Sequence, residues 1–166
     1  PVSVRPIRPE DEPLMAEFHE SLSEQSVYMR YFHMMNLDQR TAHERLTRIC
    51  FIDYDREMAL VAERRNPETG EPEIMGVGRL SRHGYAPGEA EFSVLIADPF
   101  QRRGLGTLLL RQLLEVGKSE GLRRINADIL FDNRPMQRIS KNLGFTLRRD
   151  MEEMVMKADL DLLQPA

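Results

Sequence analysis

The order of segments along the chain predicts an α/β sandwich, in which helices flank one mixed sheet. Strand-like runs alternate with segments whose apolar residues recur at helical spacing. The 166 residues, 41% of them hydrophobic, suffice for one sizeable core but leave no room for a second domain. We therefore expect a single domain over residues 1–166.

The first half of the chain predicts a strand, three helices and a hairpin. Residues 2–7 alternate as a first strand, and the prolines and acidic residues at 8–13 suit a helix start. Leu14, Phe18 and Leu22 then recur at helical spacing. Further helical patterns lie at 27–32 and 41–49, and strands at 58–62 and 74–80 enclose a turn at 66–70.

The second half alternates strands with helices before a final strand pair. The predicted elements are a strand at 92–96, a helix at 105–116, a strand at 125–130, a helix at 135–142, and two strands around Phe145 and residues 154–156. Neither a repeat nor a low-complexity segment interrupts this order.

Residues 101–107, with the sequence Gln-Arg-Arg-Gly-Leu-Gly-Thr, follow a predicted strand and open a leucine-rich helix. A turn of small residues there presents unpaired N–H groups at the positive end of a helix, which favours a diphosphate. The dinucleotide fingerprint is excluded because Leu109 stands at its third small-residue position. A P-loop at 117–119 is excluded because Gln112 replaces its first glycine and the site lies at a helix end.

The remaining pattern, Gln/Arg-x-x-Gly-x-Gly/Ala after a strand, resembles the GNAT superfamily of N-acyltransferases. In that superfamily the loop wraps the pyrophosphate of acyl-coenzyme A. Residues 133–145, Asn-Arg-Pro-Met-Gln-Arg-Ile-Ser-Lys-Asn-Leu-Gly-Phe, are similar to its asparagine-led helix that ends in Gly-Phe. The resemblance implies the GNAT fold, with a mostly antiparallel mixed sheet splayed between its fourth and fifth strands, and acetyl-CoA as the acyl donor.

By this resemblance, one set of residues binds the donor. Backbone N–H groups from the loop and the Thr107 hydroxyl are expected on the pyrophosphate, and the two arginines add charge or serve solubility alone. The expected cofactor-binding residues are Val94, Leu95, Ile96, Gln101, Arg102, Arg103, Gly104, Leu105, Gly106, Thr107 and Asn133.

Three of these residues have specific roles in the resemblance. The N–H of either Val94 or Leu95 stabilises the oxyanion, and a bulge between residues 91 and 101 could shift the count by one. The backbone of Ile96 pairs with the pantetheine arm. Asn133 either contacts that arm or caps the following helix.

Glu91 matches by position the general base of lysine-acetylating GNAT enzymes, and acyl transfer to an amine requires such a base. Glu89 competes for the role, because it lies two residues earlier on the same strand face. The alternative is that Glu91 is a surface carboxylate at the strand edge. His83 and Tyr85, in the preceding loop, are either cleft residues or ordinary loop residues.

The chain departs from the family at Ser140. Many relatives place a tyrosine four residues before the final Gly-Phe, where it protonates the leaving thiolate. Either Ser140 acts through water, or the thiolate leaves without a dedicated acid, which the ordinary thiol pKa of coenzyme A permits.

Composition limits the partners and the compartment. The 23 Lys+Arg against 27 Asp+Glu give a net charge of -4, which argues against nucleic-acid binding. No apolar run approaches the ~20 residues that cross a bilayer. The single cysteine, Cys50, excludes an internal disulfide, agrees with a reducing cytoplasm and reads as a buried small hydrophobe.

A narrower resemblance begins at residues 5–11 and continues through Phe18-His19 and residues 26–32. These segments are similar to the acetyltransferase domain of bacterial Pat-type protein lysine acetyltransferases. The start at Pro1 fits a domain excised from a longer protein. The resemblance implies an acceptor surface on the first two helices, with Tyr28, Arg30 and Phe32 as candidates, although aromatic core packing with a surface arginine explains them equally well.

The sequence therefore predicts a protein lysine N-acetyltransferase that acts on a metabolic enzyme such as an acyl-CoA synthetase. A small-amine acetyltransferase and a non-catalytic acyl-CoA-binding module are the alternatives. Neither the oligomeric state nor the preferred acyl length can be read from the sequence.

Overall fold

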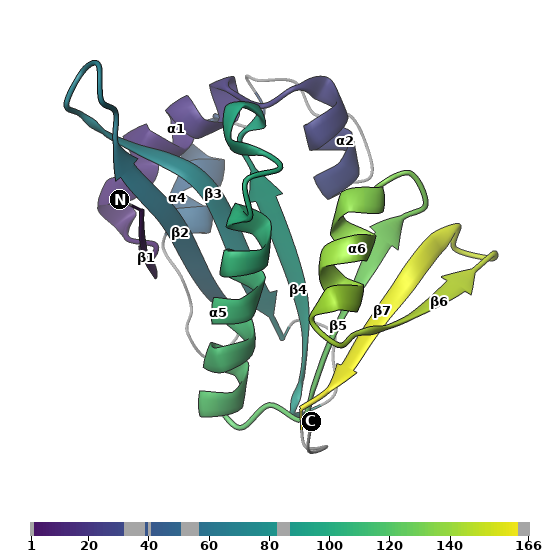
Figure 1. The fold of residues 1–166 in the computed structure, drawn as a ribbon. Helices are drawn as coiled ribbons and strands as arrows, with labels where there is room; N and C mark the ends of the chain where they lie inside the picture. The colour runs from purple at the N-terminus through teal and green to yellow at the C-terminus, as the bar shows by residue number, and fades with distance from the viewer. Residues whose placement is uncertain (1, 32–38, 40, 51–56, 83–86, 163–166) are drawn as a thin grey trace.

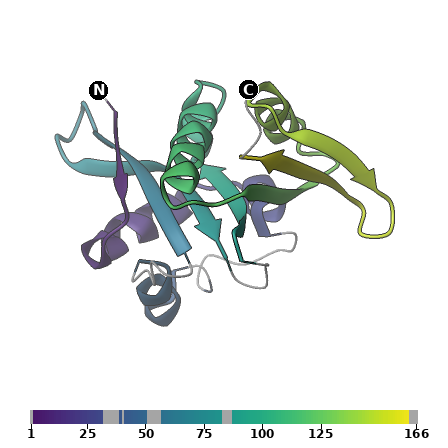
Figure 2. The same ribbon diagram turned by 90° about the horizontal axis from the view of Figure 1, so that it is seen from below.

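A computed structural model describes residues 2–31, 39, 41–50, 57–82 and 87–162. It shows one mixed sheet with helices on both faces (Figure 1; Figure 2). Seen along the sheet in Figure 2, α5 and α6 lie on one side, and α1, α2 and α4 lie on the other. The predicted α/β sandwich is confirmed.

The seven described strands follow the order β1-β2-β3-β4-β5-β7-β6. The β4–β5 pairing is parallel, whereas the other described pairings are antiparallel, as expected for a mostly antiparallel mixed sheet. The strands are β1 (Ser3–Pro6), β2 (Glu57–Arg65), β3 (Pro72–Ser81), β4 (Glu89–Ile96), β5 (Arg124–Leu130), β6 (Thr146–Asp150) and β7 (Val155–Asp161).

Each predicted helix has a counterpart among the described residues. The helices are α1 (Glu12–Glu20), α2 (Glu24–Tyr31), α4 (His43–Cys50), α5 (Leu105–Ser119) and α6 (Arg134–Asn142), with short 3-10 turns η1 (Pro9–Asp11) and η2 (Asp98–Phe100). The first helix differs from its pattern at both ends. It begins as the turn η1, and Leu22 lies beyond its end although that side chain is buried.

β4 and β5 pair over a short stretch and then separate. Their register joins residues 89–91 to residues 124–126, and the remaining residues of both strands have no partner across this seam. Figure 1 shows the two strands diverging from their common end. The predicted splay between the fourth and fifth strands is therefore confirmed.

The core on the α5 face depends on a close approach between helix and sheet. Leu109, Leu110 and Leu113 of α5 are fully buried there. A Cβ on Gly76 would lie 3.1 Å from the Leu109 side chain, and one on Gly78 would lie 3.0 Å from that of Leu113. Two glycines of β3 thus let α5 settle onto the sheet beside the splay.

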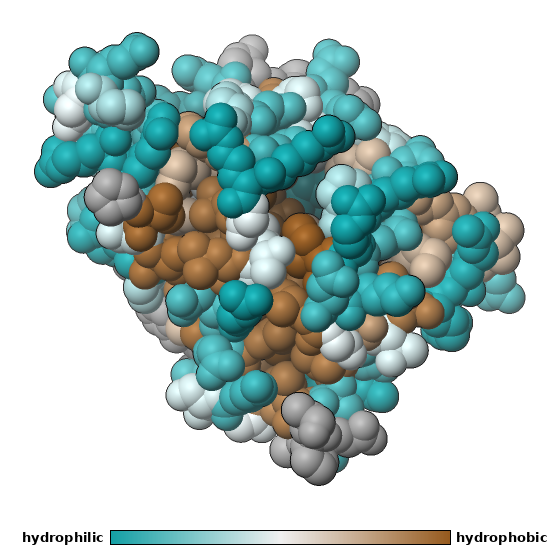
Figure 3. Space-filling model, in the orientation of Figure 1, coloured by the Kyte–Doolittle hydropathy of each residue, from teal (hydrophilic) through white to brown (hydrophobic). Residues whose placement is uncertain are grey.

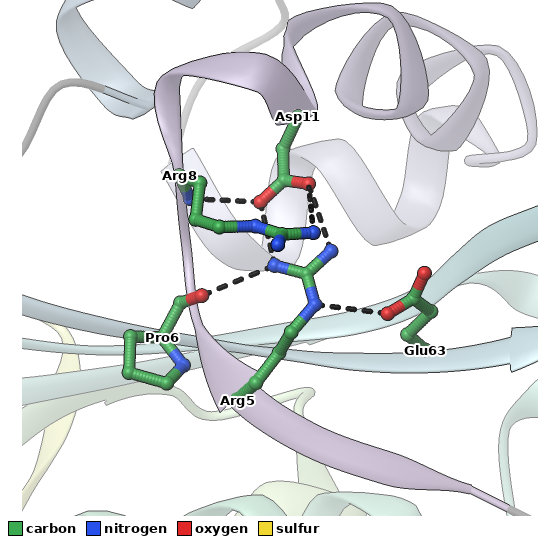
Figure 4. A network of polar contacts seen from close by, with 5 residues as sticks. All are labelled: Arg5, Pro6, Arg8, Asp11 and Glu63. Atoms are coloured by element: carbon green, nitrogen blue, oxygen red, sulfur yellow. Dashed lines mark hydrogen bonds and ion pairs between the residues drawn. The ribbon is translucent and has the colours of Figure 1, made fainter.

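An ion-pair network fixes the N-terminal strand (Figure 4). The Arg5 guanidinium donates two hydrogen bonds of 2.8 Å to Asp11 and one of 2.8 Å to Glu63. The Arg8 N–H donates a further 2.8 Å bond to Asp11. Burial by itself would raise the pKa of the Asp11 carboxyl, but the bonds from Arg5 and Arg8 outweigh it and lower that pKa.

Candidate active site

A cleft of about 1170 Å³ opens where β4 and β5 separate. Its walls come from β4, the loop between β4 and α5, the end of β5, α6, and α2. In Figure 3 the surface is hollowed between the N-terminal end of α5 and α6, and hydrophilic side chains stand at the rim. The splay thus creates a cavity of ligand size beside the predicted loop.

The loop at the start of α5 presents unpaired backbone donors. The first bond within this helix runs from the Leu108 N–H to the Gly104 carbonyl at 3.0 Å, so the preceding N–H groups have no acceptor inside the helix. Gly104 has φ 82° and Arg102 has φ 63°, both in the left-handed region. This is the helix-terminal geometry that binds phosphate groups.

The two loop glycines serve different purposes. A Cβ on Gly104 would meet nothing within 4 Å, and its positive φ is what favours glycine there. Gly106 is buried, and its Cβ would lie 3.1 Å from the Ile139 side chain of α6. Besides its place in the loop, Gly106 thus lets α5 and α6 pack.

Most of the predicted cofactor-binding residues line this one cleft. Arg103 and Leu105 do not, since Arg103 is exposed outside it and the Leu105 side chain is buried in the core. The predicted residues that line the cleft are Val94, Leu95, Ile96, Gln101, Arg102, Gly104, Gly106, Thr107 and Asn133.

Hydrogen bonds join the loop to α2. The Gln101 side-chain amide donates to the Ile96 carbonyl at 2.9 Å and to the Ser26 hydroxyl at 3.0 Å. Asp98 accepts from the Ser23 N–H at 2.9 Å and from the Ser26 hydroxyl at 3.1 Å. The first turn of α2 is thereby held against the segment that leads into the loop.

The backbone of β4 alternates between β3 and the cleft. The Ala97 N–H donates to the Met75 carbonyl of β3 at 2.8 Å, so the backbone groups of Leu95 face β3 as well, whereas those of Val94 and Ile96 face the opposite side. The β3–β4 register runs without a shift from Glu91 to Ile96. The bulge that would change the count by one is absent from this stretch.

Glu91 and Glu89 share a face of β4 but differ in their surroundings. Glu91 lines the cleft, three residues before the inward-facing backbone of Val94. Glu89 does not line the cleft, and its carboxylate lies 3.8 Å from the Arg124 guanidinium. Of the two carboxylates, only Glu91 is thus in the cleft.

Comparison with known proteins identifies the family. Residues 2–146 match the model of the acetyltransferase (GNAT) domain. The chain belongs to the GNAT acetyltransferase family. It is 31% identical over 152 residues to acetyltransferase PA5475 of Pseudomonas aeruginosa, a match that covers 92% of this chain and 78% of that protein.

Two Pat proteins are also similar to the chain. The crystal structure of the GNAT domain of S. lividans PAT has 29% sequence identity and a TM-score of 0.84, and the match covers 96% of this chain and 90% of that one. Acetyltransferase Pat of Mycolicibacterium smegmatis is 30% identical over 88 residues, which are 52% of this chain and 26% of that protein. The predicted membership of the GNAT acetyltransferases and the resemblance to Pat are confirmed.

Two residues of the GNAT asparagine-led helix now have a defined place. The Asn133 side chain accepts a 3.3 Å bond from the Met136 N–H, so it caps α6, and it also lines the cleft. Ser140 is fully buried, lies outside the cleft lining, and finds no hydrogen-bond partner for its hydroxyl within the described part of the chain. The Ser140 side chain is therefore not exposed to the cleft.

The acceptor candidates separate in the structure. Arg30 lines the cleft, whereas Tyr28 is 44% exposed and does not line it. The interpretation of Tyr28 as a core residue and of Arg30 as a surface arginine is wrong, because Tyr28 is exposed and α2 turns Arg30 toward the cleft. Phe32, His83 and Tyr85 lie outside the described residues.

Several further cleft residues were not predicted from the sequence, and four of them bear on the charge and shape of the cleft. Met29 and Tyr31 of α2 lie beside Arg30, and Arg134 and Arg138 add positive charge to the wall that α6 forms. Arg134 and Arg138 lie one helical turn apart just after Asn133, so helical spacing in the sequence could have indicated that they share a face.

Within the described residues, no helix is long and apolar enough to cross a membrane.

Proposed function

We propose that the chain transfers the acetyl group of acetyl-CoA to a lysine side chain of a metabolic enzyme such as an acyl-CoA synthetase. The observation that carries the proposal is that Glu91 and the pyrophosphate-type loop open into the same cleft. A base and a donor site in one cavity permit direct attack by the amine, without a covalent enzyme intermediate. Membership of the GNAT acetyltransferases supports the reaction type.

The loop and the start of α5 form the donor site in this proposal. The N–H groups before Leu108 bind the pyrophosphate, the Thr107 hydroxyl adds a donor, and Arg102 adds charge. Arg103, exposed beside the loop, acts only at longer range. The proposal predicts that acetyl-CoA displaces the Gln101 amide from the Ile96 carbonyl, which then accepts from the pantetheine arm.

The oxyanion is assigned to Val94 rather than Leu95. Strand alternation directs the Val94 N–H toward the splay, where no strand partner competes for it. The N–H of Leu95 faces β3 by the same alternation. A backbone donor in a site removed from bulk water stabilises the tetrahedral intermediate as negative charge develops.

Glu91 takes the proton of the attacking ammonium, directly or through water, because only the neutral amine carries a lone pair. The amine nitrogen then bonds to the thioester carbonyl carbon and becomes positively charged. It loses its surplus proton to water, and the C–S bond breaks as the intermediate collapses to the amide. Since Ser140 is buried away from the cleft, the thiolate of coenzyme A leaves without a dedicated protein acid. The ordinary acidity of a thiol, with a pKa of about 8.5, permits this.

A protein acceptor is supported by the likeness to the two Pat proteins and by the open walls of the cleft. A small-amine enzyme would need a closed pocket around its acceptor. The single buried cysteine fits a reducing compartment, which agrees with a cytoplasmic target.

The test measures coenzyme A release from acetyl-CoA with an acyl-CoA synthetase as acceptor. Glu91→Gln should lose about a hundredfold to ten-thousandfold in kcat/KM. Glu89→Gln is the matched control, since it removes a carboxylate from the same strand face outside the cleft. Calorimetric titration with acetyl-CoA should give both variants the affinity of the wild type.

Other outcomes would redirect the proposal. Turnover on polyamines or amino acids but on no protein would favour a small-amine acetyltransferase. Tight acetyl-CoA binding without turnover on any amine would favour a regulatory binding module. Equal rates for Glu91→Gln and the wild type would remove Glu91 from its role.

A further inference from the structure

Arg30 occupies an inward position of α2 that a charged residue rarely takes. Val27 of the same helix is 1% exposed. Arg30 and Tyr31 follow it by three and four residues, so they share its inward face. Both line the cleft, and the Arg30 side chain is half-buried there.

The known contact of the Arg30 guanidinium is aromatic rather than ionic. It lies 4.7 Å from the centre of the Tyr31 ring. In the described part of the chain, no carboxylate lies within 4.0 Å of it. A guanidinium carries five donors and stays charged at neutral pH, so Arg30 retains unused capacity for an anion.

Two neighbouring arginines strengthen the positive potential around Arg30. Arg45 donates a 2.8 Å bond to the Tyr31 hydroxyl and lies 5.3 Å from the ring centre. Arg79 reaches the Ile49 carbonyl at 2.9 Å and lies 3.8 Å from Glu57. Burial first, and the charge of Arg30 second, lower the pKa of Arg79, which shows that the two guanidiniums repel each other.

This arginine group lies on the face of the sheet that Glu91 occupies. Across the β3–β4 pair, Arg79 stands opposite Ser93 and Ser81 stands opposite Glu91, so all four side chains project to one face. Burial lowers the pKa of Arg30, while Tyr31 and then Glu91 raise it, so Arg30 lies within electrostatic reach of Glu91. The positive group therefore lies on the same face of the sheet as Glu91 and within its electrostatic reach.

We propose that Arg30 is a carboxylate-binding subsite of the acceptor half of the cleft, and that the target lysine is flanked by an aspartate or glutamate. The inference rests on the proposed function and names a feature of its substrate. A bidentate pair with the Arg30 fork would neutralise a charge that has no carboxylate within 4.0 Å among the described residues. It would also hold the lysine amine near Glu91.

The acceptor, rather than the donor, is the source of this carboxylate. The donor site lies at the loop and along the backbone edge of β4 that faces the splay, whereas Arg30 belongs to α2 and lies on the sheet face of Glu91. The amine must reach Glu91, so the chain that carries the amine passes Arg30. An acyl group with its own carboxylate, such as succinyl, is the competing source.

The experiment uses paired peptides that carry one lysine, with aspartate or asparagine at each position from three before to three after it. We measure kcat/KM with acetyl-CoA, and we measure peptide affinity by fluorescence anisotropy in the presence of coenzyme A. The wild type should prefer aspartate at one or two positions by about tenfold to a hundredfold. Arg30→Gln should bring that ratio close to one.

Three further variants test whether the preference for aspartate depends on the Arg30 guanidinium. Arg30→Lys should restore part of the preference, since it keeps the charge but loses the fork. Arg30→Glu should favour peptides with arginine in place of aspartate. Arg111→Gln, which removes an exposed arginine from α5 outside the cleft, should keep the wild-type ratio.

Several results would overturn the inference. Equal use of aspartate and asparagine peptides by the wild type would do so while leaving the proposed function intact. A preference for succinyl-CoA over acetyl-CoA that Arg30→Gln abolishes would move the carboxylate to the donor. If no peptide is acetylated, the proposed function is in question, and the anisotropy ratio alone still decides whether Arg30 selects a carboxylate.

Discussion

Arg5 and Arg30 are both partly buried, yet the groups that surround their guanidiniums differ. Two carboxylates approach the Arg5 guanidinium to 2.8 Å, and three bonds from it and one from the Arg8 N–H complete the network. Arg30 has the face of an aromatic ring and no described carboxylate within 4.0 Å. The first arginine is satisfied within the fold, whereas the second is left for a partner that the fold does not supply.

The difference follows from where each residue lies. Arg5 joins β1, η1 and β2 at the edge of the sheet, far along the strand order from the splay (Figure 4). Arg30 lines the cleft at the splay. A structural ion pair stabilises a fold most when both charged groups and all of their hydrogen-bond partners belong to the protein. A binding site, by contrast, supplies only one of the two charged groups, and the ligand brings the other.

The largest effect on stability should come from breaking the Arg5 network. Asp11→Ala should lower the free energy of unfolding by about 3 kcal/mol, because the Arg5 guanidinium and the Arg8 N–H both lose their acceptor in a buried site. Urea denaturation measures this change. The variant should keep wild-type kcat/KM, since Asp11 lies outside the cleft.

Arg8→Gln is the control for this prediction. The Arg8 side chain is 58% exposed, and its guanidinium lies 3.9 Å from Asp11, so its loss should change stability by less than about 0.5 kcal/mol. The double variant Arg5→Met/Asp11→Leu should recover most of the lost stability. If Asp11→Ala and Arg8→Gln lower the free energy of unfolding by equally small amounts, the network does not contribute to stability. The contrast drawn between Arg5 and Arg30 is then wrong.

Acid should weaken the same network before it affects Arg30. The folded pKa of Asp11 lies below its ordinary value of 3.8, so the folded state binds fewer protons than the unfolded state in this range. The stability that Asp11 contributes is complete above pH 3.8 and is lost as the pH falls through the folded pKa. The unfolding free energies of the wild type and Asp11→Asn should therefore converge below pH 3.8, and a constant difference down to pH 2 would contradict this.

The sequence did not predict the ion-pair network of Arg5, and it predicted the place of Arg30 only in part. It placed residues 2–7 in a strand and residues 8–13 at a helix start, but strand alternation says nothing about which distant strand supplies Glu63. Likewise, Arg30 was one of three candidates for the acceptor surface, and a surface arginine beside a packed aromatic core explained the same pattern. Only the inward turn of α2, set by its packing on β4, separated Arg30 from Tyr28.

The donor side was better predicted, because its chemistry depends on local backbone. A strand followed by Gly-x-Gly and a helix determines the unpaired N–H groups within a few residues of sequence. The second purpose of Gly106 was missed because it depends on Ile139, which lies in another helix. The choice between Val94 and Leu95 likewise depends on pairing with β3, which no spacing within β4 reveals.

Removing Arg30 should have a small effect on stability, of the opposite sign to the loss of Asp11. Arg30→Met should leave the free energy of unfolding unchanged or raise it by up to about 1 kcal/mol, because a partly desolvated charge with no described carboxylate within 4.0 Å is replaced by an apolar side chain. Thermal and urea denaturation measure the change. A loss of more than about 2 kcal/mol would show that Arg30 is a structural residue like Arg5.

The smallest predicted effect concerns Cys50, which lies between the two regions. It is the one cysteine of the chain, and it is 1% exposed. Burial first, and the charge of Asp11 second, raise the pKa of its thiol to about 11, and the charge of Arg79 partly offsets this rise. At pH 8 about one thiol in a thousand is ionised, so alkylation of the native protein should be slow.

Changes in the two regions should therefore move the Cys50 pKa in opposite directions. Asp11→Asn removes a negative charge, so the pKa should fall and iodoacetamide alkylation should quicken a few-fold at pH 8. Arg79→Met removes a positive charge, so the pKa should rise and alkylation should slow. Mass spectrometry of labelling between pH 7 and 10 measures both changes, and labelling in urea corrects for differences in reagent access. If both variants shift the labelling profile in the same direction, local opening rather than charge controls Cys50, and the thiol does not report on the contrast between the neutralised Arg5 site and the positive cleft.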